Sequence, residues 1–191
     1  MFSFSQNCLN SIAGIEQHIW SSEPEVGNFL SALIKLNKIK DIIEVGTFKG
    51  LTSSFLIDSI PEDGSFLSVD IEDCRENSVK EYFKKNNKKA KFVLEDSCKF
   101  LKSLPERSAD LIFLDSFHGY DHVKREFKHS ERVIKQGGLI CVHDYYSAFD
   151  GVGRWINEIK KMNWFETLIL NTPKDRGLVV CRCLHINYPK I

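Results

Sequence analysis

Short apolar runs rich in β-branched residues alternate along this chain with stretches in which apolar residues recur every three or four positions. The short runs predict strands buried on both faces, and the stretches between them predict amphipathic helices. We predict strands over residues 41–45, 65–70, 91–95, 110–115 and 139–144. The remaining pattern predicts helices over about residues 24–36, 51–59, 79–83, 97–104, 120–134 and 155–159, a turn at 136–138 and a loop over 145–153.

The alternation of strands and helices predicts a parallel sheet with helices on both faces. Two further strands, residues 165–170 and 178–183, are joined by a turn and predict an antiparallel hairpin at one edge. The predicted fold class is therefore α/β, a Rossmann-like, doubly wound and mostly parallel sheet of seven strands with an antiparallel C-terminal hairpin. At 191 residues, the chain is expected to form a single domain.

The first 22 residues carry their own helical pattern. Apolar side chains recur at Ile12, Ile15, Ile19 and Trp20, which predicts an amphipathic N-terminal helix. Such a helix could cover a bound substrate or form the contact of a homodimer.

Composition narrows the class of protein. The formal net charge is zero, which gives no electrostatic case for binding nucleic acid or an anionic membrane. No apolar run approaches the length of a membrane span, and the first residues lack a basic segment, so we expect a cytoplasmic protein. The six cysteines form no C-x-x-C pair and are expected to be reduced thiols.

The stretch from Asp41 to Ser53 joins a predicted strand to a predicted helix through two glycines, in the pattern Glu44-x-Gly46-x-x-x-Gly50. Glycine at position 46 permits a tight turn and a close approach of a ligand to the backbone. The spacing matches neither a dinucleotide fingerprint, which would need glycines at Phe48 and Leu51, nor a phosphate-binding P-loop. An ordinary glycine turn also fits this pattern.

Acidic residues follow the ends of the predicted strands. They are Glu44, Asp70, Asp96, Asp115 and Asp144, with His143 beside the last. Because the carboxyl ends of parallel strands meet at one edge of the sheet, where ligands bind, these side chains should gather there. Buried and unpaired carboxylates would be costly, so we expect a cationic or hydroxyl-rich ligand, a metal ion, or both.

Two positions at this edge suit a nucleoside. Asp70, at the end of the second strand, can accept hydrogen bonds from both hydroxyls of a ribose. Asp96 and Ser97 could flank an adenine, although they could equally cap the helix that follows.

Other residues at this edge suit a metal ion or a base. Asp115, His143 and Asp144 offer two carboxylates and an imidazole, a set that suits Mg or Mn and also admits Fe or Zn. His118 could take a proton from a substrate hydroxyl, or could be a surface residue at a helix start. With His122 it could also form a metal-binding pair, although the glutamate of an H-E-x-x-H motif is missing.

A family resemblance rests on several of these segments. They are Glu25-x-Gly27-x-Phe29-Leu30, Ile43-Glu44-Val45-Gly46-Thr47-Phe48-x-Gly50, Phe113-Leu114-Asp115 and Gly137-Gly138-Leu139-Ile140 with its following acid. Together they resemble the cation-dependent small-molecule O-methyltransferases of the catechol and caffeoyl-CoA type, a branch of the class I S-adenosylmethionine-dependent methyltransferases. The resemblance covers about residues 22–146.

The resemblance implies roles for individual residues. Residues expected at the S-adenosylmethionine site are Glu44, Gly46, Thr47, Gly50, Thr52, Asp70 and Ser97, and we add Asp96 and Asp115 to this set. Residues expected to hold a Mg or Mn ion are Asp115, His143 and Asp144. His118 falls where those enzymes carry a catalytic lysine, so His118 and Asp115 are the predicted catalytic residues.

This sequence also departs from that branch. His143-Asp144 stands where those enzymes have Asp-Asn, and Asp115-x-x-His118-x-Tyr120 looks more like the bacterial methyltransferases that tailor antibiotics and sugars. The first hypothesis is metal-assisted O-methylation of a small hydroxylated molecule, with His118 as base. The second is a metal-independent O- or N-methyltransferase that uses His118.

A third hypothesis is a non-catalytic module that binds S-adenosylmethionine. It predicts an exposed apolar patch around Trp155 and Trp164. For an enzyme, the acceptor pocket should be built from residues 1–22 and the loop 145–153, including Tyr145, Tyr146 and Phe149.

Overall fold

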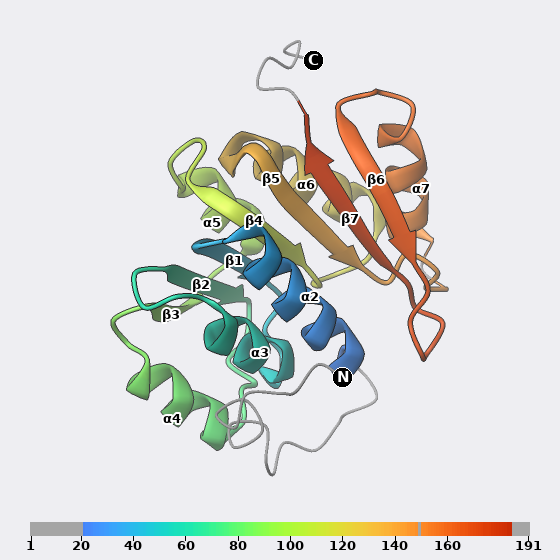
Figure 1. The fold of residues 1–191 in the computed structure, drawn as a ribbon. Helices are drawn as coiled ribbons and strands as arrows, with labels where there is room; N and C mark the ends of the chain where they lie inside the picture. The colour runs from blue at the N-terminus through green and yellow to red at the C-terminus, as the bar shows by residue number, and fades with distance from the viewer. Residues whose placement is uncertain (1–20, 149, 185–191) are drawn as a thin grey trace.

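The computed structural model describes residues 21–148 and 150–184, and in this part of the chain seven strands form one sheet (Figure 1). The strands are β1 (Asp41–Val45), β2 (Ser65–Asp70), β3 (Ala90–Leu94), β4 (Ala109–Leu114), β5 (Ile134–His143), β6 (Phe165–Leu170) and β7 (Leu178–Cys183). Their order is β3-β2-β1-β4-β5-β7-β6, and β7 alone runs in the direction opposite to the other six strands. The predicted seven-stranded, mostly parallel sheet with an antiparallel hairpin is confirmed.

Helices cover both faces of the sheet (Figure 1). They are α2 (Pro24–Asn37), α3 (Leu51–Ser59), α4 (Asn77–Lys85), α5 (Ser97–Ser103), α6 (Tyr120–Val133) and α7 (Gly151–Ile159). Two buried clusters result. Leu30, Leu56 and Val79 pack α2, α3 and α4 against one face, whereas Phe100, Phe127 and Trp155 pack α5, α6 and α7 against the other.

The cluster under α7 corrects one expectation. Trp155 is only 3% exposed and packs edge-to-face against Phe127, while the partly buried Trp164 lies against the same cluster. The exposed apolar patch predicted around these two tryptophans is therefore wrong, because α7 turns its apolar side to the sheet.

The junction of α6 and β5 also differs from expectation. The helix ends at Val133 and the strand begins at once, with Ile134 opposite Ala109 and Leu139 opposite Leu111. The predicted turn at residues 136–138 is thus an irregularity within the strand, where β5 carries more residues than β4 and must bulge.

The strand register brings the functional segments to one edge. Val45 at the end of β1 is level with Val69 of β2 and Leu114 of β4, and Leu114 is level with Val142 of β5. The residues that follow these strands therefore meet at the carboxyl edge of the sheet, as predicted.

Some expectations fall outside the described residues. The predicted amphipathic helix lies almost entirely in residues 1–20, and Phe149 is also outside. Among the helices described, none is both long and apolar enough to cross a membrane.

Candidate active site

Gly46 forms the tight turn at the end of β1. Its φ is +90°, and a Cβ at this position would lie 2.2 Å from the carbonyl oxygen of Asp115. Only glycine therefore lets the turn lie directly against the backbone that follows β4. Gly50, also at positive φ, then precedes the first turn of α3.

Asp70 ties this turn to the end of β2. Its Oδ2 accepts hydrogen bonds from the backbone N–H groups of Thr47 and Phe48, at 2.8 and 2.9 Å. Its Oδ1 accepts one long hydrogen bond, 3.3 Å from the backbone nitrogen of Glu72. Oδ1 therefore keeps capacity to accept hydrogen bonds from a ligand.

Two adjoining cavities lie along the turn. The larger, about 390 Å³, is lined by Gly46, Phe48, Val69, Asp70, Ile71, Asp96, Ser97, Asp115, Ser116, Phe117 and His122. The smaller, about 40 Å³, is lined by Ser21, Ser22, Gly46, Thr47, Phe48, Lys49, Gly50, Leu51, Thr52 and Asp115. Gly46, Phe48 and Asp115 belong to both, so the two form one cleft.

Most of the residues predicted to contact the cofactor line this cleft. Asp96 does so while also capping α5, because its Oδ1 accepts a hydrogen bond from the backbone nitrogen of Lys99 at 2.9 Å. The two roles that the sequence left open for Asp96 are therefore compatible.

Glu44 is the exception among the predicted cofactor residues. It is fully buried beneath the turn, where its Oε2 accepts hydrogen bonds from Ser53 and, at 2.6 Å, from Ser68. Burial raises the pKa of Glu44 to about 8, against the opposing effect of the two serine hydroxyls. Its Oε1 has no partner among the described residues. Glu44 lines neither cavity, so the structure places it as a support of the turn rather than as a wall of the cleft.

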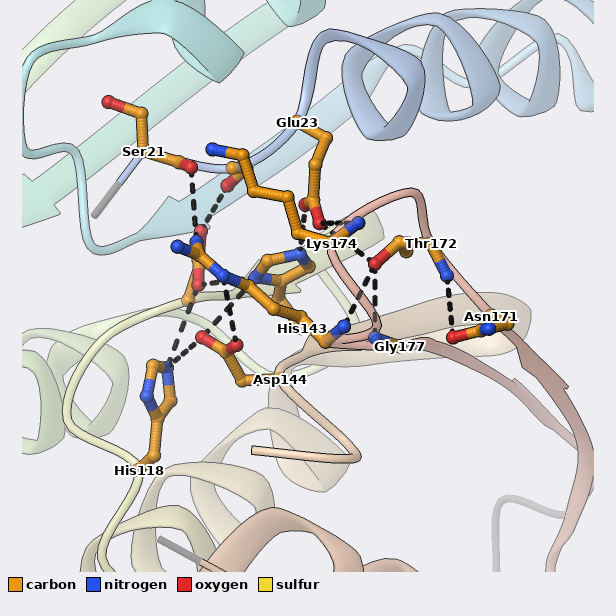
Figure 2. Close-up of polar contacts among 12 residues, drawn as sticks. Ser21, Glu23, His118, His143, Asp144, Asn171, Thr172, Lys174 and Gly177 are labelled. Atoms are coloured by element: carbon orange, nitrogen blue, oxygen red, sulfur yellow. Dashed lines mark hydrogen bonds and ion pairs between the residues drawn. The ribbon is translucent and has the colours of Figure 1, made fainter. Parts of the chain in front are cut away.

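Asp115, His118 and Asp144 converge at the end of the cleft. One potential ligand atom from each lies within 4.8 Å of the other two. The Nε2 of His118 is 3.2 Å from Asp144 Oδ2 and 3.6 Å from Asp115 Oδ1 (Figure 2). That nitrogen is buried and makes no well-formed hydrogen bond within the described residues. Two carboxylates and an imidazole thus point at a common space.

His143, at the end of β5, faces both aspartates from the buried side. It is fully buried, with Nε2 2.9 Å from Glu23 Oε2 and Nδ1 3.2 Å from Asp115 Oδ1. Its Nδ1 also lies 3.4 Å from Asp144 Oδ2, so the metal set expected from the sequence, Asp115, His143 and Asp144, stays a prediction. The group whose potential ligand atoms converge contains His118 in place of His143. Both nitrogens of His143 already face carboxylates.

The close carboxylates and imidazoles shift one another's pKa values. Burial alone would lower the pKa of His143, but the carboxylates of Asp115, Asp144 and Glu23 outweigh it and raise the pKa to about 12. Burial would likewise raise the pKa of Asp115, yet the neighbouring His143 and His118 hold it well below its usual range. A buried imidazolium therefore sits behind the two aspartates.

Glu23 was missed as a site residue by sequence reasoning, which assigned it only to the start of a helix. Its Oε1 accepts hydrogen bonds from Thr172 Oγ1 at 2.9 Å and from the backbone nitrogen of Lys174 at 3.3 Å (Figure 2). Burial would raise the pKa of Glu23, but the hydrogen bond from His143 and those around it lower the pKa to about 2. Glu23 thereby joins the start of α2, the end of β5 and the β6–β7 loop.

Further contacts hold residues 21–23 against Asp115 and Asp144. The hydroxyl of Ser22 donates a hydrogen bond to Asp115 Oδ2, and the guanidinium of Arg176 donates one to the carbonyl oxygen of Ser21 at 3.1 Å. The Nε of Arg176 also lies 4.0 Å from Asp144 Oδ1. No local sequence signal marks these contacts, since they join residues far apart in the chain.

His118 and His122 do not act as a pair. The imidazole of His118 faces Asp115 and Asp144, whereas the Nε2 of His122 lies 2.9 Å from Glu126 Oε1. The paired metal site considered for these two histidines is therefore wrong.

Comparison with known proteins agrees with this geometry. The sequence profile of the methyltransferase domain family matches residues 43–145. This chain belongs to that family. The match begins within β1 and ends just past β5, and so includes the glycine turn, Asp70, Asp115, His118 and Asp144.

Individual relatives are similar over part or all of the chain. A protein of Mycobacterium sp. (strain KMS), whose name proposes O-methyltransferase activity, is 29% identical over 125 residues, which cover 63% of this chain and 55% of that protein. The chain thus matches about half the length of such relatives.

Solved structures extend the likeness of the fold to nearly the whole chain. A Klebsiella pneumoniae protein named for a proposed O-methyltransferase activity superposes with a TM-score of 0.79 at 20% identity, covering 97% of this chain and 93% of its own. TomG of Streptomyces achromogenes, an O-methyltransferase of tomaymycin synthesis solved with S-adenosylmethionine, gives 0.76 at 15% identity, with 97% and 92% covered. At these identities the likeness shows the fold alone.

Proposed function

We propose that this protein transfers a methyl group from S-adenosylmethionine to a hydroxyl group of a small molecule. The observation that carries the proposal is the continuity of the cleft. It runs along the glycine turn from Asp70 and Ser97 to Asp115, where the cluster of Asp115, His118 and Asp144 begins. Membership of the methyltransferase domain family and the likeness to TomG support it.

The residues of the cleft fit the parts of this cofactor. Asp70 Oδ1 can accept hydrogen bonds from the ribose hydroxyls, and the Asp96–Ser97 side of the larger cavity would hold the adenine. The smaller cavity, with Ser22 and Thr52 in its wall, would take the amino-acid part. Gly46 lines both cavities and lets the turn lie against the backbone of Asp115, with which a Cβ would clash. When bound, the cofactor supplies a methyl group made electrophilic by its sulfonium.

The cluster at the end of the cleft would prepare the acceptor. The side chain of His118 is 22% exposed while its Nε2 is buried against the two carboxylates, so Nδ1 would be the nitrogen that accepts the proton of the acceptor hydroxyl. Burial opposes charge on this imidazole, but Asp115 and Asp144 outweigh that effect and raise the pKa of His118, which makes it a stronger base. The two carboxylates also hold the imidazole ring in place. A fixed ring would help to align the acceptor oxygen with the methyl group, and such alignment supplies a large part of the rate enhancement of enzymes.

The same three residues also fit a divalent cation. The buried Nε2 of His118 lacks a proper hydrogen-bond partner among the described residues, and two carboxylate oxygens face it. Asp115, His118 and Asp144 would hold the ion, which would lower the pKa of the acceptor hydroxyl. His118 would then act as a ligand rather than as the base.

Calorimetric titration with S-adenosylhomocysteine, on wild type and on Asp70→Asn, tests the cofactor site. In Asp70→Asn the amide oxygen can still accept from Thr47 and Phe48, but the second acceptor atom becomes a donor. We expect binding to wild type and at least about tenfold weaker binding to the variant. No binding to wild type would overturn the proposal.

An acceptor screen then tests the reaction. Small phenols, sugars and other hydroxylated compounds are offered with S-adenosylmethionine, and formation of S-adenosylhomocysteine is measured with and without a chelator. Activity that survives chelation would support His118 as the base that accepts the proton of the acceptor. Activity that is lost on chelation and restored by Mg²⁺ or Mn²⁺ would support Asp115, His118 and Asp144 as metal ligands. Cofactor binding without transfer to any acceptor would favour the non-catalytic module.

A further inference from the structure

Glu126 of α6 is a buried carboxylate that holds two residues of the larger cavity. It is 2% exposed, and its Oε1 accepts a hydrogen bond from Ser116 Oγ at 2.7 Å and lies 2.9 Å from His122 Nε2. Ser116 and His122 both line the cavity, whereas Glu126 does not. Glu126 therefore lies behind the wall and fixes the side chains that form it.

This contact differs from an ordinary pair on a helix surface. Exposed pairs four residues apart contribute only a few tenths of a kcal/mol and need no burial. A buried carboxylate is costly unless its oxygens accept hydrogen bonds. Here the two side chains that contact the Glu126 carboxylate, Ser116 and His122, are also the two that line the larger cavity. The buried carboxylate therefore fixes their orientation.

The orientation leaves part of the His122 ring available. Beyond Glu126, its Nε2 lies 3.4 Å from Ser97 Oγ, and its ring meets Phe117 edge-to-face at 5.7 Å. Its Nδ1 has no hydrogen-bond partner among the residues that the structure describes. The hydrogen bond to Glu126 raises the pKa of His122. Above that pKa the ring is neutral, its Nε2 hydrogen is directed at Glu126, and Nδ1 is a hydrogen-bond acceptor, so the ligands are compared at a pH where the ring is neutral.

We propose that His122, positioned by Glu126, recognises the 6-amino group of the cofactor's adenine. This inference rests on the proposed function, because it assigns the adenine to the part of the cleft lined by Ser97, Phe117 and His122. An acceptor at Nδ1 matches the amino group of adenine and repels the 6-oxo group of hypoxanthine. His122 is thus a binding residue, and Glu126 acts through it.

The test compares two ligands that differ at that one group. S-adenosylhomocysteine and S-inosylhomocysteine are titrated by calorimetry into wild type, His122→Phe and Glu126→Gln. The phenyl ring keeps the shape and the contact with Phe117 but has no nitrogen. His129→Phe is the matched control, since His129 lies on the same helix but lines neither cavity of the cleft.

We expect wild type and His129→Phe to prefer the adenine ligand by about tenfold, as a missing or opposed hydrogen bond in a polar site costs at least that much. In His122→Phe the ratio should fall to about two or less. In Glu126→Gln it should fall between these values, because glutamine can also donate to Nε2 and so no longer fixes the ring hydrogen. Each ratio is measured on one protein, so partial unfolding cancels.

An equal affinity of wild type for the two ligands would overturn the inference, and so would an unchanged ratio in His122→Phe. If wild type bound neither ligand, the proposed function itself would fail and this inference with it. Binding of both ligands without preference would leave the cofactor site standing and remove only the role of His122.

Discussion

The imidazole of His143 lies 2.9 Å from the carboxylate of Glu23, which stands 120 residues earlier in the chain. Both side chains are buried, and each lies at the end of an element, His143 at the last position of β5 and Glu23 just before α2. The contact locks the segment before α2 onto the carboxyl edge of the sheet. Because Asp115 faces the other nitrogen of His143, the same contact fixes a residue of the candidate active site.

Glu23→Gln should therefore destabilise the fold. The variant keeps the size of the side chain but leaves the His143 imidazolium with one carboxylate fewer, and breaking a buried pair from one side costs about 3 kcal/mol. Urea denaturation measures the difference in unfolding free energy. Glu25→Gln, an exposed change two residues on, should stay within about 0.5 kcal/mol of wild type. Equal stability of the two variants would contradict the structural role of Glu23.

Gly46→Ala should abolish cofactor binding and destabilise the protein by about 3 kcal/mol, since it adds a clash with the Asp115 backbone to the strain of a positive φ. Gly137→Ala is a matched control because Gly137 also has a positive φ, +76°, but a Cβ added there would meet no atom within 4 Å. That variant should lose only about 1 kcal/mol, the cost of the backbone conformation. Thermal unfolding and titration with S-adenosylhomocysteine distinguish the two.

The buried Glu44 should make stability depend on pH. Its pKa is about 8 in the folded protein and 4.5 ordinarily, so the native state keeps a proton that the unfolded chain releases between these values. Its contribution to stability is thus fully present below about pH 4.5 and is lost as the pH rises through about 8. Urea denaturation of wild type and Glu44→Gln at about pH 5, 7 and 9 measures this. The stability of wild type relative to the variant should fall steadily across the series, and a constant difference would argue against a raised pKa.

His118→Ala should lower turnover by about a hundredfold or more while leaving the affinity for S-adenosylhomocysteine within about twofold, because His118 lies beside Asp115 and Asp144 and lines neither cavity of the cleft. Steady-state rates on an acceptor found by the screen, together with calorimetry, check both parts. His129→Ala, on the neighbouring helix, should leave both unchanged. Wild-type turnover in His118→Ala would remove this residue from the reaction.

The alternation of strands and helices along the chain and the gathering of acids at one edge of the sheet were predictable from the sequence. Hydrophobic spacing is a local property, and a buried parallel strand or an amphipathic helix leaves its period in the residues themselves. The glycine turn was equally readable, because only glycine suits its positive φ, and so was Asp96 as the cap of α5. The strands, the helices, the turn and the cap each depend on residues close together in the chain, and the gathering of the acids follows because the carboxyl ends of parallel strands meet at one edge.

Tertiary structure alone decided which of those side chains meet. It brought His118 as well as His143 to Asp115 and Asp144, and it supplied Glu23 from the start of α2 and Thr172 from the β6–β7 loop. The sequence by itself determined the edge of the sheet at which the chemistry lies. The choice of partners there depends on side-chain directions and on contacts between residues far apart in the chain, which no local spacing records.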